Sequence, residues 1–144
     1  MLKALSLVCY AAMVGGLLGL LATRSLLSPS PIVVALQLVA VLLMIWARVT
    51  FGRRSFHLAA NPTGGGLVTT GPYRFIRHPI YTAVCLFTTA GAAAHLSWTT
   101  LLFCAVVWGG ALARIFCEEH LLKFRYPEYR QYAARTSRMI PFVF

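Results

Sequence analysis

The residues best suited to chemistry lie in two short stretches, separated by about forty residues. The first is Gly71–Tyr81, where a turn precedes two arginines, a histidine and two tyrosines, and Pro79 opens a long apolar run. The second is Glu118-Glu119, which holds two of the three carboxylate side chains of the protein. Ionisable groups beside long apolar runs are costly to hold, so they usually have a function. We predict that the two stretches meet in one site.

These residue types suit the binding of a charged, polar cofactor against an apolar substrate. A carboxylate accepts hydrogen bonds from an ammonium or a ribose diol, and an arginine binds a carboxylate through two N–H groups. Hydrolysis by a Ser/His/Asp arrangement is disfavoured because the chain has no aspartate. Structural roles stay open for the same side chains: ion pairs at helical spacing, a helix cap, or interfacial anchoring of tyrosines. The ion pairs in question are Arg114–Glu118 and Glu119–Lys123.

The composition is that of a membrane protein. Of 144 residues, 59% are hydrophobic and 11% are charged, and the mean hydropathy is +0.75, whereas a soluble domain has about 25% charged residues. The net charge of +10 comes from 13 Lys and Arg against 3 Glu. Because the basic residues lie beside apolar runs, anionic lipid head groups are favoured as partners and nucleic acid is disfavoured.

The cysteines give no sign of a metal centre. None of them is paired in a Cys-x-x-Cys motif, and each lies within or at the end of an apolar run, as a small hydrophobic residue does. A zinc site needs closely spaced ligands, and the sequence has no such set. We therefore predict that the protein has no metal site. The cysteines are Cys9, Cys85, Cys104 and Cys117.

Apolar runs separated by helix breakers position the candidate residues. They predict an all-α fold: an integral membrane bundle of four transmembrane helices with a C-terminal amphipathic helix at the interface. We expect one membrane domain, residues 1–144, with a loop over 48–78 and an interfacial tail over 117–144. The last helix is predicted from Glu128 to about Arg138. The predicted spans are residues 4–23, 32–47, 79–96 and 98–116.

The glycines suggest one packing surface and one loop. Gly15, Gly16 and Gly19 give a small-residue face in the first span, Gly15-x-x-x-Gly19, which either lets another helix approach closely or is ordinary for a membrane helix. Asn61–Gly66 contains three consecutive glycines and is predicted to be a flexible hinge or lid, with a contact between its backbone and a ligand as the second interpretation.

The distribution of basic residues predicts the orientation in the membrane. Four spans place Lys3, the segment 48–77 and the whole tail on one side, and Arg24 alone on the other. Since Lys and Arg accumulate in cytoplasmic segments, both termini and the site are predicted to be cytoplasmic.

The motifs resemble those of one enzyme superfamily. The stretch 67–81, LVTTGPYRFIRHPIY, is followed by Glu-Glu-x-x-Leu-x-x-x-x-Pro-x-Tyr-x-x-Tyr from Glu118. Together they resemble the isoprenylcysteine carboxyl methyltransferase and phospholipid methyltransferase superfamily, over roughly residues 67–141. In that family an Arg-His-Pro-x-Tyr-x-Gly element and a Glu-Glu pair bind S-adenosylmethionine; Ala83 replaces the glycine here. The candidate cofactor-binding residues are Tyr73, Arg77, His78, Pro79, Tyr81, Glu118 and Glu119.

The resemblance implies methyl transfer from S-adenosylmethionine to a lipid-like or small hydrophobic acceptor at the cytoplasmic membrane face, with an isoprenylcysteine-type carboxylate favoured. We expect Arg114, Arg125 or Arg130 to position an anionic acceptor, and His78 or a glutamate to take a proton from an amine acceptor. Two alternatives stay open: an NADPH-dependent, sterol-type membrane reductase, and a non-enzymatic small membrane subunit. The sequence leaves the oligomeric state open.

Overall fold

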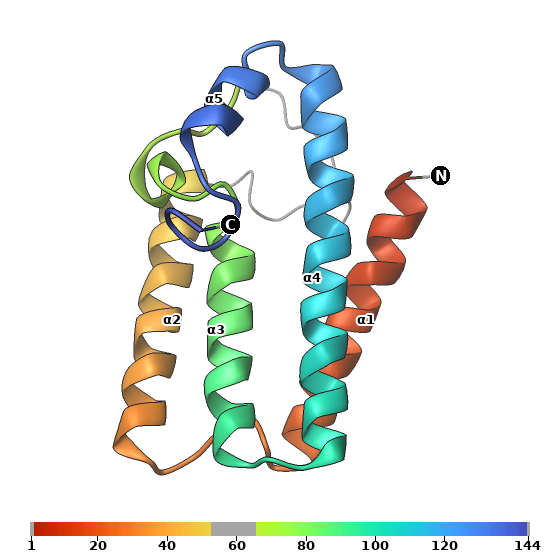
Figure 1. Ribbon diagram of the computed structural model, residues 1–144, viewed down its shortest axis with the longest axis vertical. Coiled ribbons are helices and arrows are strands. Elements are labelled where there is room, and N and C mark those ends of the chain that lie inside the picture. Colours follow the sequence, from red (N-terminus) through yellow and green to blue (C-terminus); the bar gives the residue numbers. More distant parts are fainter. Residues whose placement is uncertain (1, 53–65, 144) are drawn as a thin grey trace.

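The computed structural model describes residues 2–52 and 66–143, and within them it confirms an all-α fold (Figure 1). Residues 61–65 of the predicted hinge lie outside the described residues. A short 3-10 turn, η2, precedes α3 and covers Gly71–Arg74. The helices are α1 (Leu2–Ala22), α2 (Pro31–Phe51), α3 (Pro79–Ala94), α4 (Trp98–Arg125) and α5 (Tyr129–Arg135).

Three of these helices are long and apolar enough to cross a membrane. They are α1 over Ala4–Ala22, α2 and α4, with mean hydropathies of 2.1, 2.4 and 1.9. α3 is apolar but shorter, at 16 residues, against the roughly 20 that a helix needs to span a bilayer. α4 continues from the fourth predicted span to Arg125, so Glu118 and Glu119 lie on its last turns.

The bundle consists of two helix pairs joined side by side. α1 packs along α4, α2 packs along α3, and contacts between α3 and α4 join the pairs (Figure 1). The core combines residues of α1, α3 and α4 with one residue from the C-terminal tail, Met139. The tail therefore closes the core at the end of the bundle where α5 lies.

Glycines allow α1 and α4 to approach closely. A Cβ added at Gly16 would lie 2.9 Å from the carbonyl oxygen of Phe103, and one added at Gly110 would lie 2.7 Å from that of Cys9. Gly19 lies against the Phe103 ring, whereas a Cβ at Gly15 would meet nothing within 4 Å. The predicted small-residue face does pack against a helix, but through Gly16 and Gly19 rather than through Gly15.

The C-terminal helix is shorter than predicted. α5 ends at Arg135, and Thr136 has extended backbone angles. From there residues 136–139, which we name the strap, run back along the chain before α3, with a parallel bridge between Ile76 and Ser137. The backbone groups of the strap bond to another segment, so they do not continue the helix.

Candidate active site

The turn before α3 is built by local sequence. Gly71 has a φ of 57°, a left-handed conformation that favours glycine, and a Cβ there would collide with the Thr50 side chain. His78 caps α3 and Pro79 occupies its first turn, where a missing N–H costs nothing. The helix therefore begins sharply, and Arg77 and His78 lie against the last turns of α4.

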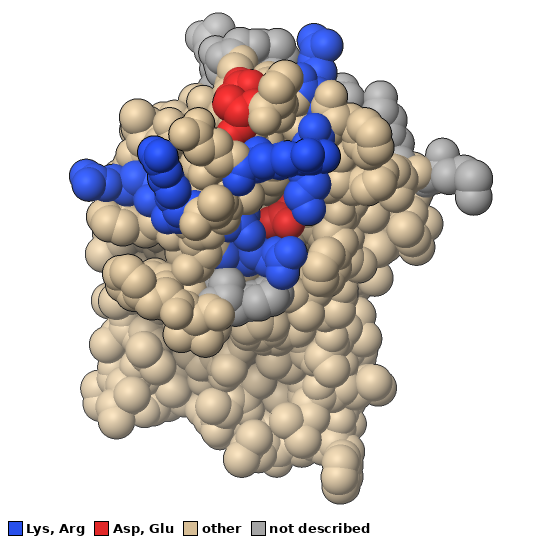
Figure 2. Space-filling model, turned by 45° about the horizontal axis from the view of Figure 1, so that its top comes forward, with Lys and Arg blue, Asp and Glu red and all other residues tan. Residues whose placement is uncertain are grey.

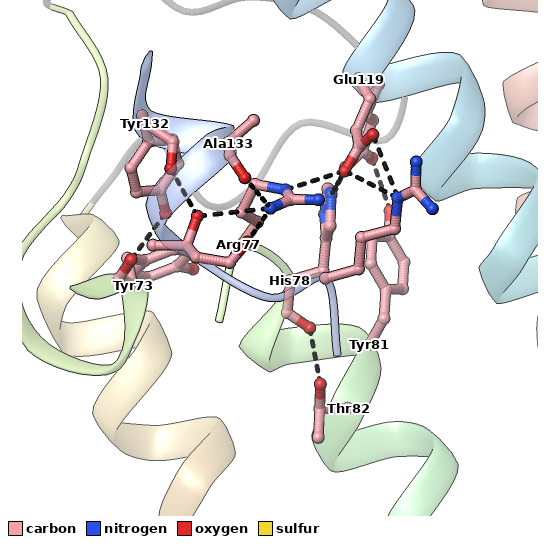
Figure 3. Close-up of polar contacts among 11 residues, drawn as sticks. Tyr73, Arg77, His78, Tyr81, Thr82, Glu119, Tyr132 and Ala133 are labelled. Atoms are coloured by element: carbon pink, nitrogen blue, oxygen red, sulfur yellow. Dashed lines mark hydrogen bonds and ion pairs between the residues drawn. The ribbon is translucent and has the colours of Figure 1, made fainter. Parts of the chain in front are cut away.

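Glu119 is the centre of a buried ionic cluster (Figure 3). Its Oε1 accepts a hydrogen bond from Arg77 Nε at 2.9 Å, and its Oε2 accepts one from Arg138 Nε at 3.2 Å. His78 Nε2 lies 3.5 Å from Oε1. The Glu119 side chain is only 4% exposed, and a charge at that depth is tolerated only when it is paired.

Glu118 faces a second cluster. Its Oε1 accepts hydrogen bonds from the Tyr81 hydroxyl at 2.5 Å and from Arg114 Nη2 at 3.2 Å. Arg114 Nε also donates to the Tyr81 hydroxyl at 2.7 Å. The other oxygen, Oε2, lies 3.7 Å from His78 Nδ1, so the imidazole lies between the two glutamates. The Glu118 side chain is 23% exposed, more than any other member of its cluster.

The tail closes one side of the site. The Tyr132 hydroxyl donates to the carbonyl oxygen of Tyr73 at 2.6 Å, and burial raises the pKa of Tyr132 to about 12. Burial, and then the charge of Glu119, raise the pKa of Tyr129 above its usual range. Both phenols stay protonated at neutral pH, and the Tyr132 hydroxyl is a hydrogen-bond donor.

The structure brings most of the predicted residues together. Arg77, His78, Tyr81, Glu118 and Glu119 meet in one network with Arg114, while Pro79 shapes the corner and Tyr73 lies at its edge. Their roles in cofactor binding and catalysis stay predictions. Of the two expected ion pairs, Arg114–Glu118 is formed; in the part of the chain that the structure describes, Glu119 pairs with Arg77 and Arg138 rather than with Lys123.

The other two candidate arginines lie outside this network. Arg125 and Arg130 are exposed, at the end of α4 and on α5. Sequence reasoning missed Arg138, which reaches Glu119 from the strap. One feature of the sequence could have indicated that Arg138 lies outside the last helix. Thr136-Ser137 is a pair of weak helix formers, which favours an end of the helix before them.

Comparisons with the sequences of known proteins place this chain in a family. The sequence model of the phospholipid methyltransferase family matches residues 30–129. The nickel-cobalt-cadmium resistance protein NccN of Alcaligenes xylosoxydans xylosoxydans is 38% identical over 78 residues, which cover 52% of this chain and 36% of that protein. Protein-S-isoprenylcysteine O-methyltransferases B and A of Arabidopsis thaliana are 35% and 34% identical over 102 residues, covering 67% of this chain.

The chain spans about half the length of the Arabidopsis proteins, 51% of each, and 36% of NccN. No solved structure matches it at a significant level. The family match covers more than half of the chain and includes both Arg77-His78-Pro79 and Glu118-Glu119. The chain therefore belongs to the phospholipid methyltransferase family, a family of S-adenosylmethionine-dependent membrane methyltransferases.

Proposed function

We propose that this protein transfers a methyl group from S-adenosylmethionine to a lipid-like or small hydrophobic acceptor at the cytoplasmic face of a membrane. We favour an isoprenylcysteine-type carboxylate as the acceptor class, because two relatives are named as protein-S-isoprenylcysteine O-methyltransferases. The observation that carries the proposal is the convergence of His78, Tyr81 and Glu118 at the end of an apolar bundle.

The donor set fits S-adenosylmethionine. Glu118 is the more exposed glutamate, and its carboxylate suits a ribose diol or the cofactor's ammonium group. His78 and Tyr81 lie beside it, with ring centroids 5.9 Å apart, and offer ring surfaces and polar atoms. When bound, the cofactor supplies a methyl group on a sulfonium sulfur for direct transfer to a nucleophile in line with it.

The protein's contribution to such a reaction is orientation. Arg114 is buried and donates to Ser6, Tyr81 and Glu118, so it is fixed where an anionic acceptor could be positioned from within the bundle. Alignment of two reactants contributes on the order of 7–11 kcal/mol when it is good. A carboxylate acceptor arrives ionised and needs no base, whereas an amine acceptor would give its proton to His78 or Glu118.

The chain path supports four spans. α2 ends beside the site, where the Phe51 and Tyr73 rings lie 5.4 Å apart, and α3 also begins there, at Pro79. α4 begins at the far end of the bundle, at Trp98, and ends beside the site (Figure 1). If α2 and α4 cross the membrane, α3 must cross it as well, because it joins the two ends.

Calorimetry tests the proposal. Purified protein in detergent is titrated with S-adenosylmethionine, with its demethylated product and with NADPH. Glu118→Gln removes a charged acceptor and is expected to weaken cofactor binding about tenfold or more, since a hydrogen bond to a charged group contributes about 1.5–3 kcal/mol. Glu128→Gln, the same change at an exposed position before α5, is the matched control and should bind like wild type. Binding of NADPH alone, or of none of the three, would refute the proposal.

A further inference from the structure

The two neighbouring glutamates have different surroundings. Glu118 is partly exposed, and only its Oε1 accepts hydrogen bonds within the described residues, from Tyr81 and Arg114. Its Oε2 lies 3.7 Å from His78 Nδ1, beyond hydrogen-bond distance. Glu119 is buried, and both of its oxygens accept hydrogen bonds from arginine, Oε1 from Arg77 and Oε2 from Arg138. Arg138 Nε is also 3.3 Å from Oε1. Both carboxylate oxygens of Glu119 are therefore already bonded to the protein itself.

The partners of Glu119 come from two segments that bond to each other. The backbone N–H of Arg77 donates to Ser137 and that of His78 donates to Arg138, at 2.8 and 2.9 Å, and Ser137 N–H donates to Phe75 at 3.1 Å. The Thr82 hydroxyl donates to the carbonyl oxygen of Met139 at 2.9 Å. The strap is thus bonded to the turn that carries Arg77 and His78 and, at Met139, to the first turn of α3.

The side chains continue this attachment. Arg77 donates through Nη1 to the carbonyl oxygens of Ala133 and Thr136 while its Nε binds Glu119, so it links the end of α5 to α4 (Figure 3). Met139 is 1% exposed and packs in the core. The strap lies beyond residues 30–129, where the family match ends.

We propose that Glu119 is a positioning residue: with Arg77 and Arg138 it forms an internal clamp that holds the strap against the start of α3. Glu118 is then the carboxylate of the pair that meets the ligand. A ligand that took Glu119 from its partners would leave two arginines without their counter-charge in a largely buried site, which is costly. The assignment of Glu118 rests on the proposed function, whereas the clamp belongs to the protein without ligand.

The clamp is tested without ligand, by amide hydrogen exchange of the full chain in detergent micelles. The informative amides are those of Arg77, His78 and Ser137, which join the strap to the turn. Glu119→Gln and Arg138→Gln should each speed their exchange about tenfold or more, since local opening exposes them. Arg138→Lys should recover part of the protection, because it keeps the charge. Arg135→Gln, at an exposed arginine at the end of α5, is the matched control and should exchange like wild type.

Titration with S-adenosylmethionine separates the two glutamates. Glu118→Gln should weaken binding and leave the exchange of the strap unchanged, whereas Glu119→Gln and Arg138→Gln should change both. In the double variant Glu119→Gln/Arg138→Gln, the strap amides should exchange no faster than in the more affected single variant. The reason is that both substitutions break the same interaction. Cofactor binding weakened by Glu119→Gln with strap exchange at the wild-type rate would overturn the clamp. If the wild-type protein binds no S-adenosylmethionine but Glu119→Gln and Arg138→Gln still speed the exchange of the strap amides, the proposed function is overturned and the clamp is supported.

Discussion

Arg114 belongs both to the candidate active site and to the contacts that hold the bundle together. It lies on α4, yet it contacts α1 through the Ser6 carbonyl oxygen and the Tyr10 ring, and α3 through the Tyr81 hydroxyl. A planar guanidinium carries five N–H donors spread over three nitrogens and can reach three segments at once, whereas the three donors of a lysine ammonium lie on a single nitrogen. Its side chain is only 4% exposed, so an acceptor that reaches it must enter the bundle.

This geometry predicts which of the three candidate arginines controls turnover. We expect Arg114→Lys to lower kcat/KM by about a hundredfold, in line with the cost of disturbing a buried charged hydrogen-bond network. Methyl transfer to an isoprenylcysteine analogue is the assay, and thermal unfolding checks that the variant is folded. Lys123→Ala, at an exposed cation near the end of α4, is the control.

The same assay on Arg125→Ala and Arg130→Ala tests the alternative. A large loss in either variant, with Arg114→Lys fully active, would move the acceptor from the bundle to the exposed tail.

At the scale of the elements, the site depends on how closely α1 and α4 approach. Gly16 faces the backbone of α4 at Phe103, and Gly110 faces the backbone of α1 at Cys9. Backbone atoms cannot move aside as the end of a flexible side chain can, so added volume at these glycines must separate the helices. Such a separation would shift the Ser6 carbonyl oxygen relative to Arg114.

Two neighbouring glycines therefore provide a matched pair. Gly16→Ala should destabilise the protein by about 1–3 kcal/mol, the usual cost of overpacking. Gly15→Ala, where a Cβ meets nothing within 4 Å, should be neutral or stabilising by up to about 1 kcal/mol through helix propensity. Reversible unfolding in mixed micelles measures both variants. Equal stability of the two would show that α1 and α4 are not in close contact.

Over the whole molecule, charge is concentrated at one end. Figure 2 shows Lys and Arg gathered on the face that carries the site, above an uncharged surface. Among the residues that the structure describes, the exposed cations at this end include Arg74, Lys123, Arg125, Arg130 and Arg135. At the other end of α1 Arg24 is exposed, at the turn before α2. The uncharged sides suit lipid chains, and the basic end suits an anionic surface.

This asymmetry predicts the orientation. A reporter fused after Phe144 should be cytoplasmic, because the positive-inside rule places the basic end there. A fusion pair of a cytoplasmic fluorescent reporter and a periplasmic phosphatase, compared in a bacterial host, measures the side directly. Phosphatase activity without fluorescence would refute the predicted topology.

Local features of the sequence predict the helices and part of the candidate site. Apolar runs and breakers such as Pro31 and Pro79 predict α1 to α4, because length, hydropathy and proline act over neighbouring residues. The Arg114–Glu118 pair follows from a spacing of four on one helix. The sequence also predicted that His78 lies near the glutamates. That prediction rested on the free-energy cost of ionisable groups beside apolar runs and on the family resemblance.

The different partners of Glu118 and Glu119 follow from tertiary packing and not from a local pattern. Arg138 meets Glu119 because the chain leaves the helix after Arg135 and turns back along residues 75–78. In the same way, Gly16 rather than Gly15 became the close contact because of how α1 is rotated against α4. Which residues contact each other in these places depends on the sum of contacts between segments far apart in the chain. A pattern within one segment therefore cannot predict these contacts. Sequence alone thus determined which groups were available, and packing determined which of them are bound to each other.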